Sequence, residues 1–213
     1  MSLSYPLSLA SSGTTLVPSS VSTTTRTGKP ISDSETFTYP REYNFPPFFT
    51  LQRISSTSHA QSQKWSSLIQ SYCRFHRLFK LSLIDAVSSP LFHNARINKR
   101  LELNDAREMV EFMRKEGRAE WIGSGKGDER RNTAWIWWRN PEEWANAIAE
   151  WVEETGQKNT VLTLYELTES DITVSQEFHG MDPEVLQKAL STLVKRGKAQ
   201  VFGQEDQQGV KFF

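Results

Sequence analysis

An apolar stripe with helical spacing occurs twice along the chain. The first stripe consists of Ala106, Met109, Val110 and Met113, and the second of Leu186, Ala189, Leu190 and Leu193, offset by 80 residues. Side chains three and four residues apart share one face of an α-helix. Both segments are therefore predicted to be helices with one buried face.

The segments that follow the two stripes also match. Residues 111–123 and 191–203 each run from a basic helix end through glycine, a basic residue, alanine, a polar residue and two apolar residues to a second glycine. A glycine just beyond a helix can adopt the left-handed conformation that ends it. The apolar residues then predict the first strand of a hairpin, with return strands at 134–138 and 210–213. A repeat of this length indicates two copies of one small domain rather than a solenoid.

Further elements complete the first copy. A helix is predicted over Gln63–Lys80, a short strand over Leu81–Ile84, a helical turn over Pro90–Asn94, and a helix capped by Asn104. The expected buried face of the first helix consists of Trp65, Leu68, Ile69, Tyr72, His76 and Phe79. On that face His76 is interpreted as a packed core histidine rather than a ligand. The order helix, strand, helix, helix, two-stranded wing is that of a winged helix.

The second copy follows without a linker. Asn140 is the predicted cap of a helix with Pro141 in its first turn. Its expected buried stripe consists of Trp144, Ala147, Ile148 and Trp151. An extended piece at 161–163, a short helix at 164–168 and a helix opened by Asp182, with Val194 also turned inward, complete the copy. Since no flexible segment intervenes, the two domains are expected to pack rigidly.

The sequence thus predicts an α+β fold, mainly α, of two tandem winged-helix domains with short antiparallel wings. Residues 1–38 contain ten serines and eight threonines. Such a segment cannot bury enough apolar surface to offset its ordering entropy, and is predicted to be a disordered tail. The first winged helix with a preceding arm is assigned to residues 39–139, and the second to residues 140–213.

The arm is rich in aromatic residues and proline. Residues 39–51 hold five aromatic residues and three prolines. Pro46 and Pro47 are expected to keep the backbone extended, close to polyproline II, and to present Phe45, Phe48 and Phe49. From these residues alone, the arm could either pack on its own domain or insert into a groove of a partner.

Charge and composition narrow the function. Lysine plus arginine and aspartate plus glutamate number 25 each, so no net field draws the chain to nucleic acid or anionic lipid. No apolar run is long enough to span a bilayer, and the first residues lack the pattern of a secretory signal. The single cysteine, Cys73, excludes an intramolecular disulfide and fits a reducing compartment. These features predict a soluble cytosolic protein.

The sequence gives little evidence for residues that bind nucleic acid, phosphate or metal, or that catalyse a reaction. The two helices that could read a duplex carry both charge signs, which disfavours the alternative of a winged-helix nucleic-acid-binding factor. The glycine run at 123–127 lacks the spacing of a phosphate loop. The four histidines are scattered without metal-ligand spacing, and nothing near Cys73 would activate a thiol. We therefore expect a protein that is not an enzyme, with no cofactor and no metal.

Six motifs, in order along residues 43–213, resemble one known family. They are Phe45–Gln52, Ser89–Phe92, Trp138–Trp144, Thr163–Leu167, Glu177–Gly180 and Gly209–Phe213. They are similar to the vacuolar protein-sorting-associated protein 25 family, the small subunits of the endosomal sorting complex ESCRT-II. The Ser/Thr-rich tail lies outside this resemblance.

The resemblance implies an adaptor that works through surfaces. Members of the family are present in two copies in a Y-shaped complex with two larger winged-helix subunits, and insert a Pro-Pro-x-Tyr-like segment into them. The matching residues here are Pro46, Pro47, Phe48 and Phe49, where Phe49 replaces the tyrosine and so lacks its hydroxyl. Together with Phe45, these are the predicted partner-binding residues. The second winged helix is implied to recruit the first ESCRT-III subunit during sorting of ubiquitinated cargo into multivesicular bodies. The expected location is the cytoplasm, with recruitment to the endosomal membrane through the complex.

Overall fold

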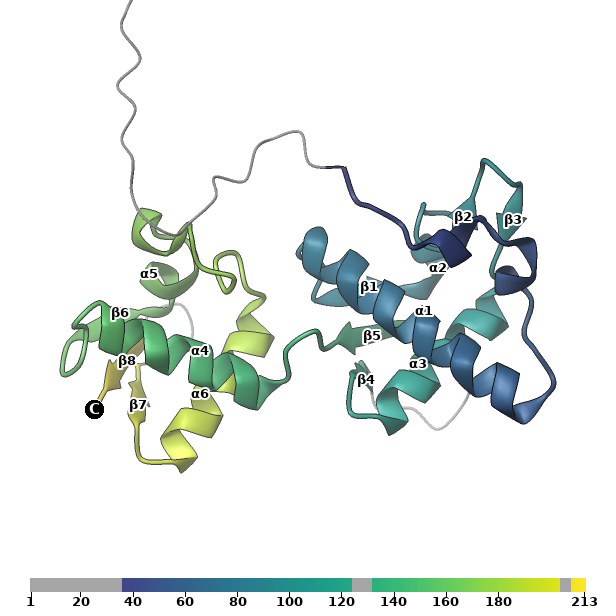
Figure 1. The fold of residues 1–213 in the computed structure, drawn as a ribbon. Helices are drawn as coiled ribbons and strands as arrows, with labels where there is room; N and C mark the ends of the chain where they lie inside the picture. The colour runs from purple at the N-terminus through teal and green to yellow at the C-terminus, as the bar shows by residue number, and fades with distance from the viewer. Residues whose placement is uncertain (1–35, 124–131, 204–207) are drawn as a thin grey trace, which may run out of the picture. The chain divides into compact units, whose positions relative to one another are not determined.

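The computed structural model describes residues 36–123, 132–203 and 208–213. Ser34–Phe213 forms one compact unit, in which one order of elements occurs twice (Figure 1). We call residues 36–139 the first repeat and residues 140–213 the second repeat. The predicted tail lies outside the described residues except for 36–38, and so does most of the glycine run at 123–127.

The first repeat surrounds a three-stranded sheet. Its larger elements are α1 Ser55–Phe75, β1 Lys80–Ser82, α2 Leu83–Ala86, α3 Leu103–Lys115, β4 Ala119–Trp121 and β5 Thr133–Ile136. A small hairpin, β2 His93–Asn94 with β3 Lys99–Arg100, lies between α2 and α3. The sheet order is β1-β5-β4, and both pairs are antiparallel.

The second repeat has the same order of elements. They are α4 Pro141–Glu154, β6 Val161–Thr163, α5 Leu164–Thr168, η4 Asp171–Thr173, α6 Pro183–Lys195, β7 Ala199–Phe202 and β8 Gly209–Phe212. The sheet order β6-β8-β7 repeats that of the first sheet, again with antiparallel pairs. The predicted class of fold, helices combined with short antiparallel sheets in a tandem repeat, is confirmed.

The predicted glycine turns occur in both repeats. Gly117 and Gly197 follow α3 and α6 with φ of 71° and 68°. The next amide in each copy donates to a carbonyl five residues earlier, Arg118 to Met113 at 2.8 Å and Lys198 to Leu193 at 2.9 Å. These bonds close a left-handed helix end and send the chain into the hairpin.

Helix α4 begins as predicted. The Asn140 side chain accepts a hydrogen bond from the Glu143 amide at 2.8 Å, and the Glu143 carboxylate accepts one from the Asn140 amide at 2.7 Å. With Pro141 in the first turn, this reciprocal pair satisfies two backbone donors at the start of the helix.

Several predicted details are wrong. Helix α1 begins and ends earlier than predicted, so His76 is exposed just beyond it and Phe79 packs elsewhere. Residues 90–94 form a turn and a strand because the chain reverses into the β2–β3 hairpin. The Asn104 side chain accepts from the Arg107 guanidinium at 2.8 Å and caps nothing, since α3 already starts at Leu103. Val194 is exposed, and α4 buries Ala145 more completely than Ala147.

Two hydrophobic cores meet at strand β5. Ala134 and Ile136 belong to the core of the first repeat, whereas Trp135 and Trp137 belong to the core of the second. Successive side chains of a strand point to opposite faces, so β5 contributes to both cores. Phe79, beside β1, also joins the second core. The two repeats therefore share buried surface rather than being joined by a free linker.

Candidate partner-binding site

The aromatic arm is folded onto the first repeat as two short helical turns. Pro46–Phe49 forms a 3-10 helix, η2, after an earlier turn, η1, at Arg41–Asn44. The amide of Phe48 donates to the carbonyl of Phe45 at 2.9 Å, and the amide of Thr50 donates to that of Pro47 at 3.2 Å. The expected extended, polyproline II backbone is therefore wrong for these residues.

Buried polar groups of α1 hold η2 in place. The Phe48 carbonyl accepts hydrogen bonds from Gln61 Nε2 at 2.8 Å and from Trp65 Nε1 at 3.0 Å. Gln61 Nε2 also donates to the Thr50 carbonyl at 2.9 Å, and Gln61 Oε1 accepts from the Gln52 amide at 3.1 Å. Gln61 is buried, and these hydrogen bonds replace those that its side-chain amide would make to water. The arm backbone is thus tied to the helix by the helix's own side chains.

Aromatic packing adds to this attachment. The ring of Phe48 stacks on that of Trp65, with centroids 4.3 Å apart and an interplanar angle of 8°. Phe49 meets the edge of Trp65 at 5.5 Å and that of Tyr43 at 5.3 Å. Stacked and edge-to-face pairs of this kind are favoured by the ring quadrupole. Phe37 extends the cluster against Tyr72, so a residue of the predicted tail packs on the first core.

The tyrosines of this cluster are fixed by hydrogen bonds and burial. The Tyr43 hydroxyl donates to the Pro90 carbonyl, and the Tyr43 carbonyl accepts from Asn94 Nδ2 at 2.7 Å. Burial, with a smaller contribution from Tyr72, raises the pKa of Tyr39 to about 12. Burial likewise raises the pKa of Tyr43. A tyrosine hydroxyl is neutral at physiological pH in any case, so the raised pKa values report the burial of these two side chains rather than a change of charge.

The five predicted binding residues divide into two groups. Phe48 and Phe49 are only 5% and 4% exposed and form part of the chain's own core. The sequence analysis expected the arm to present these two side chains, and in this structure it does not. Phe45 is 61% exposed, and Pro46 and Pro47 are exposed beside it. Because two prolines lie between Phe45 and the anchored Phe48, the backbone that carries Phe45 has little conformational freedom.

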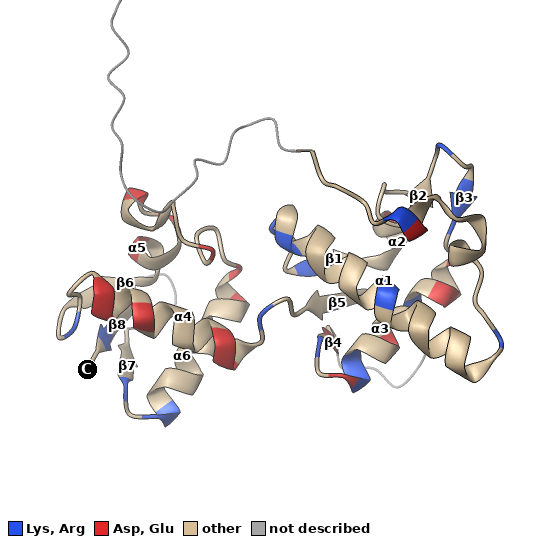
Figure 2. Ribbon diagram, in the orientation of Figure 1, with Lys and Arg blue, Asp and Glu red and all other residues tan. Residues whose placement is uncertain are grey.

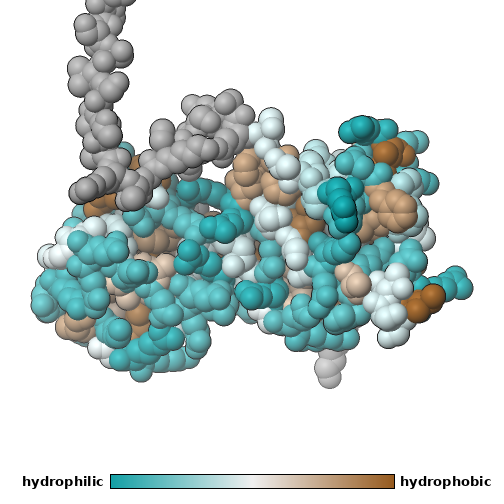
Figure 3. Space-filling model, viewed as in Figure 1, coloured by the Kyte–Doolittle hydropathy of each residue, from teal (hydrophilic) through white to brown (hydrophobic). Residues whose placement is uncertain are grey.

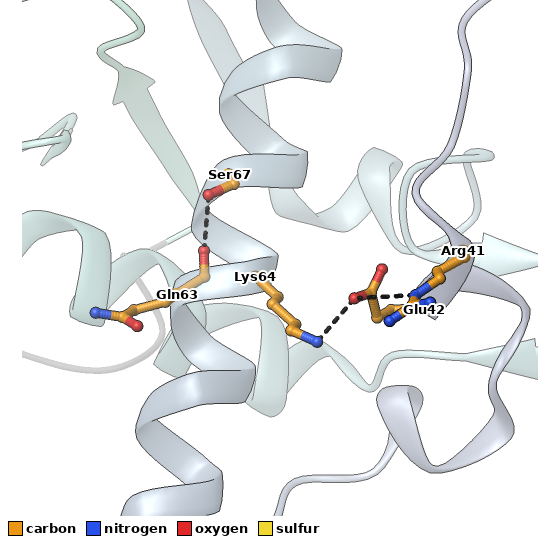
Figure 4. Close-up of polar contacts among 5 residues, drawn as sticks. All are labelled: Arg41, Glu42, Gln63, Lys64 and Ser67. Atoms are coloured by element: carbon orange, nitrogen blue, oxygen red, sulfur yellow. Dashed lines mark hydrogen bonds and ion pairs between the residues drawn. The ribbon is translucent and has the colours of Figure 1, made fainter.

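A groove of about 370 Å³ runs beside this exposed group. It is lined on the arm side by Phe45 and Pro47 and on the helix side by Ala60 and Lys64. Lys64 Nζ lies 2.8 Å from a Glu42 carboxylate oxygen, which is also 4.0 Å from Arg41 Nε (Figure 4). The Lys64 partner lowers the pKa of Glu42, although the carboxylate is exposed. An apolar groove with a charged rim is suited to a peptide or loop of a partner.

Sequence reasoning missed Gln61 and Trp65 as the pair of side chains that binds the arm backbone. The helical stripe located Trp65 as a core residue but gave no sign that its Nε1 would bind the arm. Gln61 carries no local signal, since a glutamine in a polar stretch of helix is ordinarily exposed. Their role depends on a contact with a segment 13 to 17 residues earlier in the chain.

Helix α6, the candidate duplex reader of the second repeat, packs against the first repeat. Lys188 Nζ lies 2.6 Å from a Glu120 carboxylate oxygen and within 5.9 Å of the Trp135 ring centroid. Figure 2 shows both charge signs spread over the two repeats. In the view of Figure 3, hydrophobic areas are separated by hydrophilic ones.

Catalytic and metal chemistry find no support among the residues described. Cys73 is fully buried, and burial raises the pKa of its thiol to about 12. Within ranges 36–123, 132–203 and 208–213, no three His, Cys, Asp or Glu side chains are grouped to hold a metal ion. In the same residues, no helix is both long and apolar enough to cross a membrane.

Comparison with known proteins agrees with the resemblance seen in the motifs. The family model described as an ESCRT-II complex subunit matches residues 42–182. Vacuolar protein-sorting-associated protein 25 of Xenopus laevis is 42% identical over 177 residues, covering 83% of this chain and 99% of the relative. The protein of the same name from Homo sapiens is 41% identical, covering 83% of this chain and 98% of the relative.

Solved structures give the same result. The crystal structure of subunit VPS25 of the endosomal trafficking complex ESCRT-II has a TM-score of 0.72 at 31% identity, covering 82% of this chain and 98% of that one. A chain in the crystal structure of ESCRT-II (VPS22/VPS25/VPS36) has a TM-score of 0.70 at 31% identity, with coverage of 81% and 98%. From the family model, the sequence identity and the shared fold together, this chain belongs to the ESCRT-II complex subunit family.

Proposed function

We propose that this chain is the non-enzymatic small subunit of an ESCRT-II complex in endosomal trafficking. It acts as an adaptor in the sorting of ubiquitinated membrane cargo into multivesicular bodies. The proposal is carried by 42% identity across almost the full length of vacuolar protein-sorting-associated protein 25 of Xenopus laevis, and is supported by the likeness to a solved subunit of the ESCRT-II endosomal trafficking complex. The protein works in the cytoplasm and reaches the endosomal membrane through the complex.

The arm and the first repeat bind the two larger subunits. Phe45, Pro46 and Pro47 form the contact surface, and Phe48 and Phe49 hold that surface in place from within the core. This division differs from an arm that inserts all five residues into a partner. It is supported by the two hydrogen bonds and the stacked ring that fix Phe48 on α1.

The arm contact is tested by co-purification of the full chain with the two larger subunits. Burying one aromatic ring contributes roughly 1.5–3 kcal/mol, so Phe45→Ala with Pro47→Ala should weaken assembly roughly 10- to 150-fold. Ile84→Ala is the matched control, because Ile84 is also exposed (55%) but lies on α2. Equal recovery of the complex with both variants would count against the arm as contact surface.

The second repeat recruits the first ESCRT-III subunit. Deleting residues 140–213 would be a poor test, because Trp135 and Trp137 of the first repeat are buried only as part of the second core. Binding of the purified first ESCRT-III subunit to the intact chain is the cleaner measurement. Lack of binding by the intact chain would refute this part of the proposal.

A further inference from the structure

Helices α1, α3, α4 and α6 end in the same way, but α1 does so without a glycine. After the other three helices, the residue with positive φ is a glycine, at positions 117, 156 and 197. After α1 this position holds Arg77, with a φ of 52°. The amide of Leu78 then donates to the Cys73 carbonyl at 2.8 Å, and the corresponding amides after the other helices also donate to a carbonyl five residues earlier.

The side chain of Arg77 accounts for this exception. A left-handed backbone is strained for arginine because of its Cβ, and glycine avoids that strain. Strained residues that persist often serve a function. Arg77 Nη1 donates to the His179 carbonyl in the second repeat and lies 3.5 Å from the carbonyl of Gln176. A glycine would end α1 equally well but could not make this contact.

The preceding turn of α1 holds the same loop of the second repeat, residues 176–179. The Glu177 carboxylate lies 2.7 Å from Arg74 Nε and 2.9 Å from Arg139 Nη2. Phe178, from the same loop, is 1% exposed and belongs to the core of the second repeat. The loop is therefore fixed on one side in the second core and bound on the other side by arginines of the first repeat.

Helix α1 also holds the arm, closer to its start. Gln61 and Trp65 donate hydrogen bonds to the arm backbone, and Gln70 Nε2 donates to the Trp137 carbonyl at 2.7 Å. With a rise of 1.5 Å per residue, Trp65 and Arg74 are about 14 Å apart along the helix axis. One continuous helix thus contacts both the arm, which is the surface proposed for the larger subunits, and the second repeat.

We propose that Arg74, Arg77 and Glu177 form a clasp that fixes the angle between the two repeats. The burial of Trp135 and Trp137 in the second core holds the repeats together at the sheet. A single contact leaves freedom to tilt about it, and the clasp removes that freedom because it is a second point of attachment at the end of α1. The angle at which the second repeat is presented is then set by the helix that carries the arm. This inference does not depend on which partner binds the second repeat.

The test measures the distance between the repeats in the full chain by pulsed electron paramagnetic resonance. Spin labels are placed at Glu108→Cys on α3 and Glu154→Cys on α4, which are exposed positions, while the buried Cys73 stays unlabelled. We expect one narrow distance distribution with the clasp intact. Arg77→Gly and Glu177→Gln should each at least double the width of the distribution.

The two variants exclude simpler explanations of a broadened distribution. Since glycine ends three other helices, Arg77→Gly should retain the end of α1 and remain folded in thermal unfolding. Glu177→Gln keeps the shape of the side chain and leaves α1 unaltered. Arg114→Gln is the matched control, because it breaks an exposed arginine–glutamate pair within the first repeat and should leave the width unchanged. If either clasp variant leaves the width unchanged, or if the control broadens it equally, the proposal is overturned.

Discussion

Replacing Phe48 by alanine tests the packing of the arm on its own chain separately from the contact of the arm with a partner. The substitution removes a ring that is 5% exposed and stacks on Trp65 at 4.3 Å. It leaves the Phe48 carbonyl in place, so the hydrogen bonds from Gln61 and Trp65 can still form. The loss is therefore that of a packed aromatic side chain, while the hydrogen bonds between the arm and α1 remain.

The expected size of the effect follows from core substitutions in other proteins. Truncating a buried phenylalanine to alanine costs about 3–5 kcal/mol, because apolar burial is lost and a cavity remains. Each kcal/mol shifts the melting temperature by roughly 2–4 °C in a chain of this length, so we expect a fall of roughly 6–20 °C. Scanning calorimetry measures the melting temperature, and near-UV circular dichroism reports on the packing of the aromatic side chains as a whole.

Phe45→Ala is the control for the same assay. Phe45 is 61% exposed, and surface substitutions of this kind change stability by about 0.5 kcal/mol or less. The account therefore predicts that Phe48→Ala melts earlier and Phe45→Ala melts as the unchanged chain does. Equal melting temperatures for the two variants would show that η2 is not packed on α1 in solution.

Three further predictions concern single residues. Asn140→Ala should destabilise the chain by about 0.5–2 kcal/mol in urea unfolding through loss of the cap of α4, whereas Asn140→Asp should retain most of the stability. Gly197→Ala should cost about 1–3 kcal/mol because φ is 68°; Gly197→Asn should cost less, and equal costs would argue against a left-handed turn. Cys73 should not react with a thiol reagent at pH 8 unless denaturant is added. Its folded pKa of about 12 exceeds the reference of 9.0, so its contribution to stability is complete below pH 9 and falls as the pH rises toward 12.

The parts of the fold that were predictable are those set by local pattern. The stripe at 106–113 and its copy at 186–193 located α3 and α6, and Gly117 and Gly197 located their ends. The caps of α4 and α6 were also readable, because a capping side chain acts within three residues of itself. For these elements, the information lies within a few turns of chain.

The parts that were not predictable depend on distant contacts. The arm was expected to be extended because Pro46 and Pro47 favour that state locally, but Gln61 and Trp65 bind its backbone in a 3-10 turn. One feature of the sequence indicates that the two repeats share buried surface. β5 is apolar on both faces, at Ala134 and Ile136 as well as at Trp135, which is typical of a strand covered on both sides.

A structure of the chain assembled with the two larger ESCRT-II subunits would show directly how the arm binds. We expect Phe45, Pro46 and Pro47 to be buried against a partner, while Phe48 and Phe49 remain packed on Trp65. A complex in which Phe48 and Phe49 leave Trp65 and enter a pocket of a partner subunit would contradict this expectation.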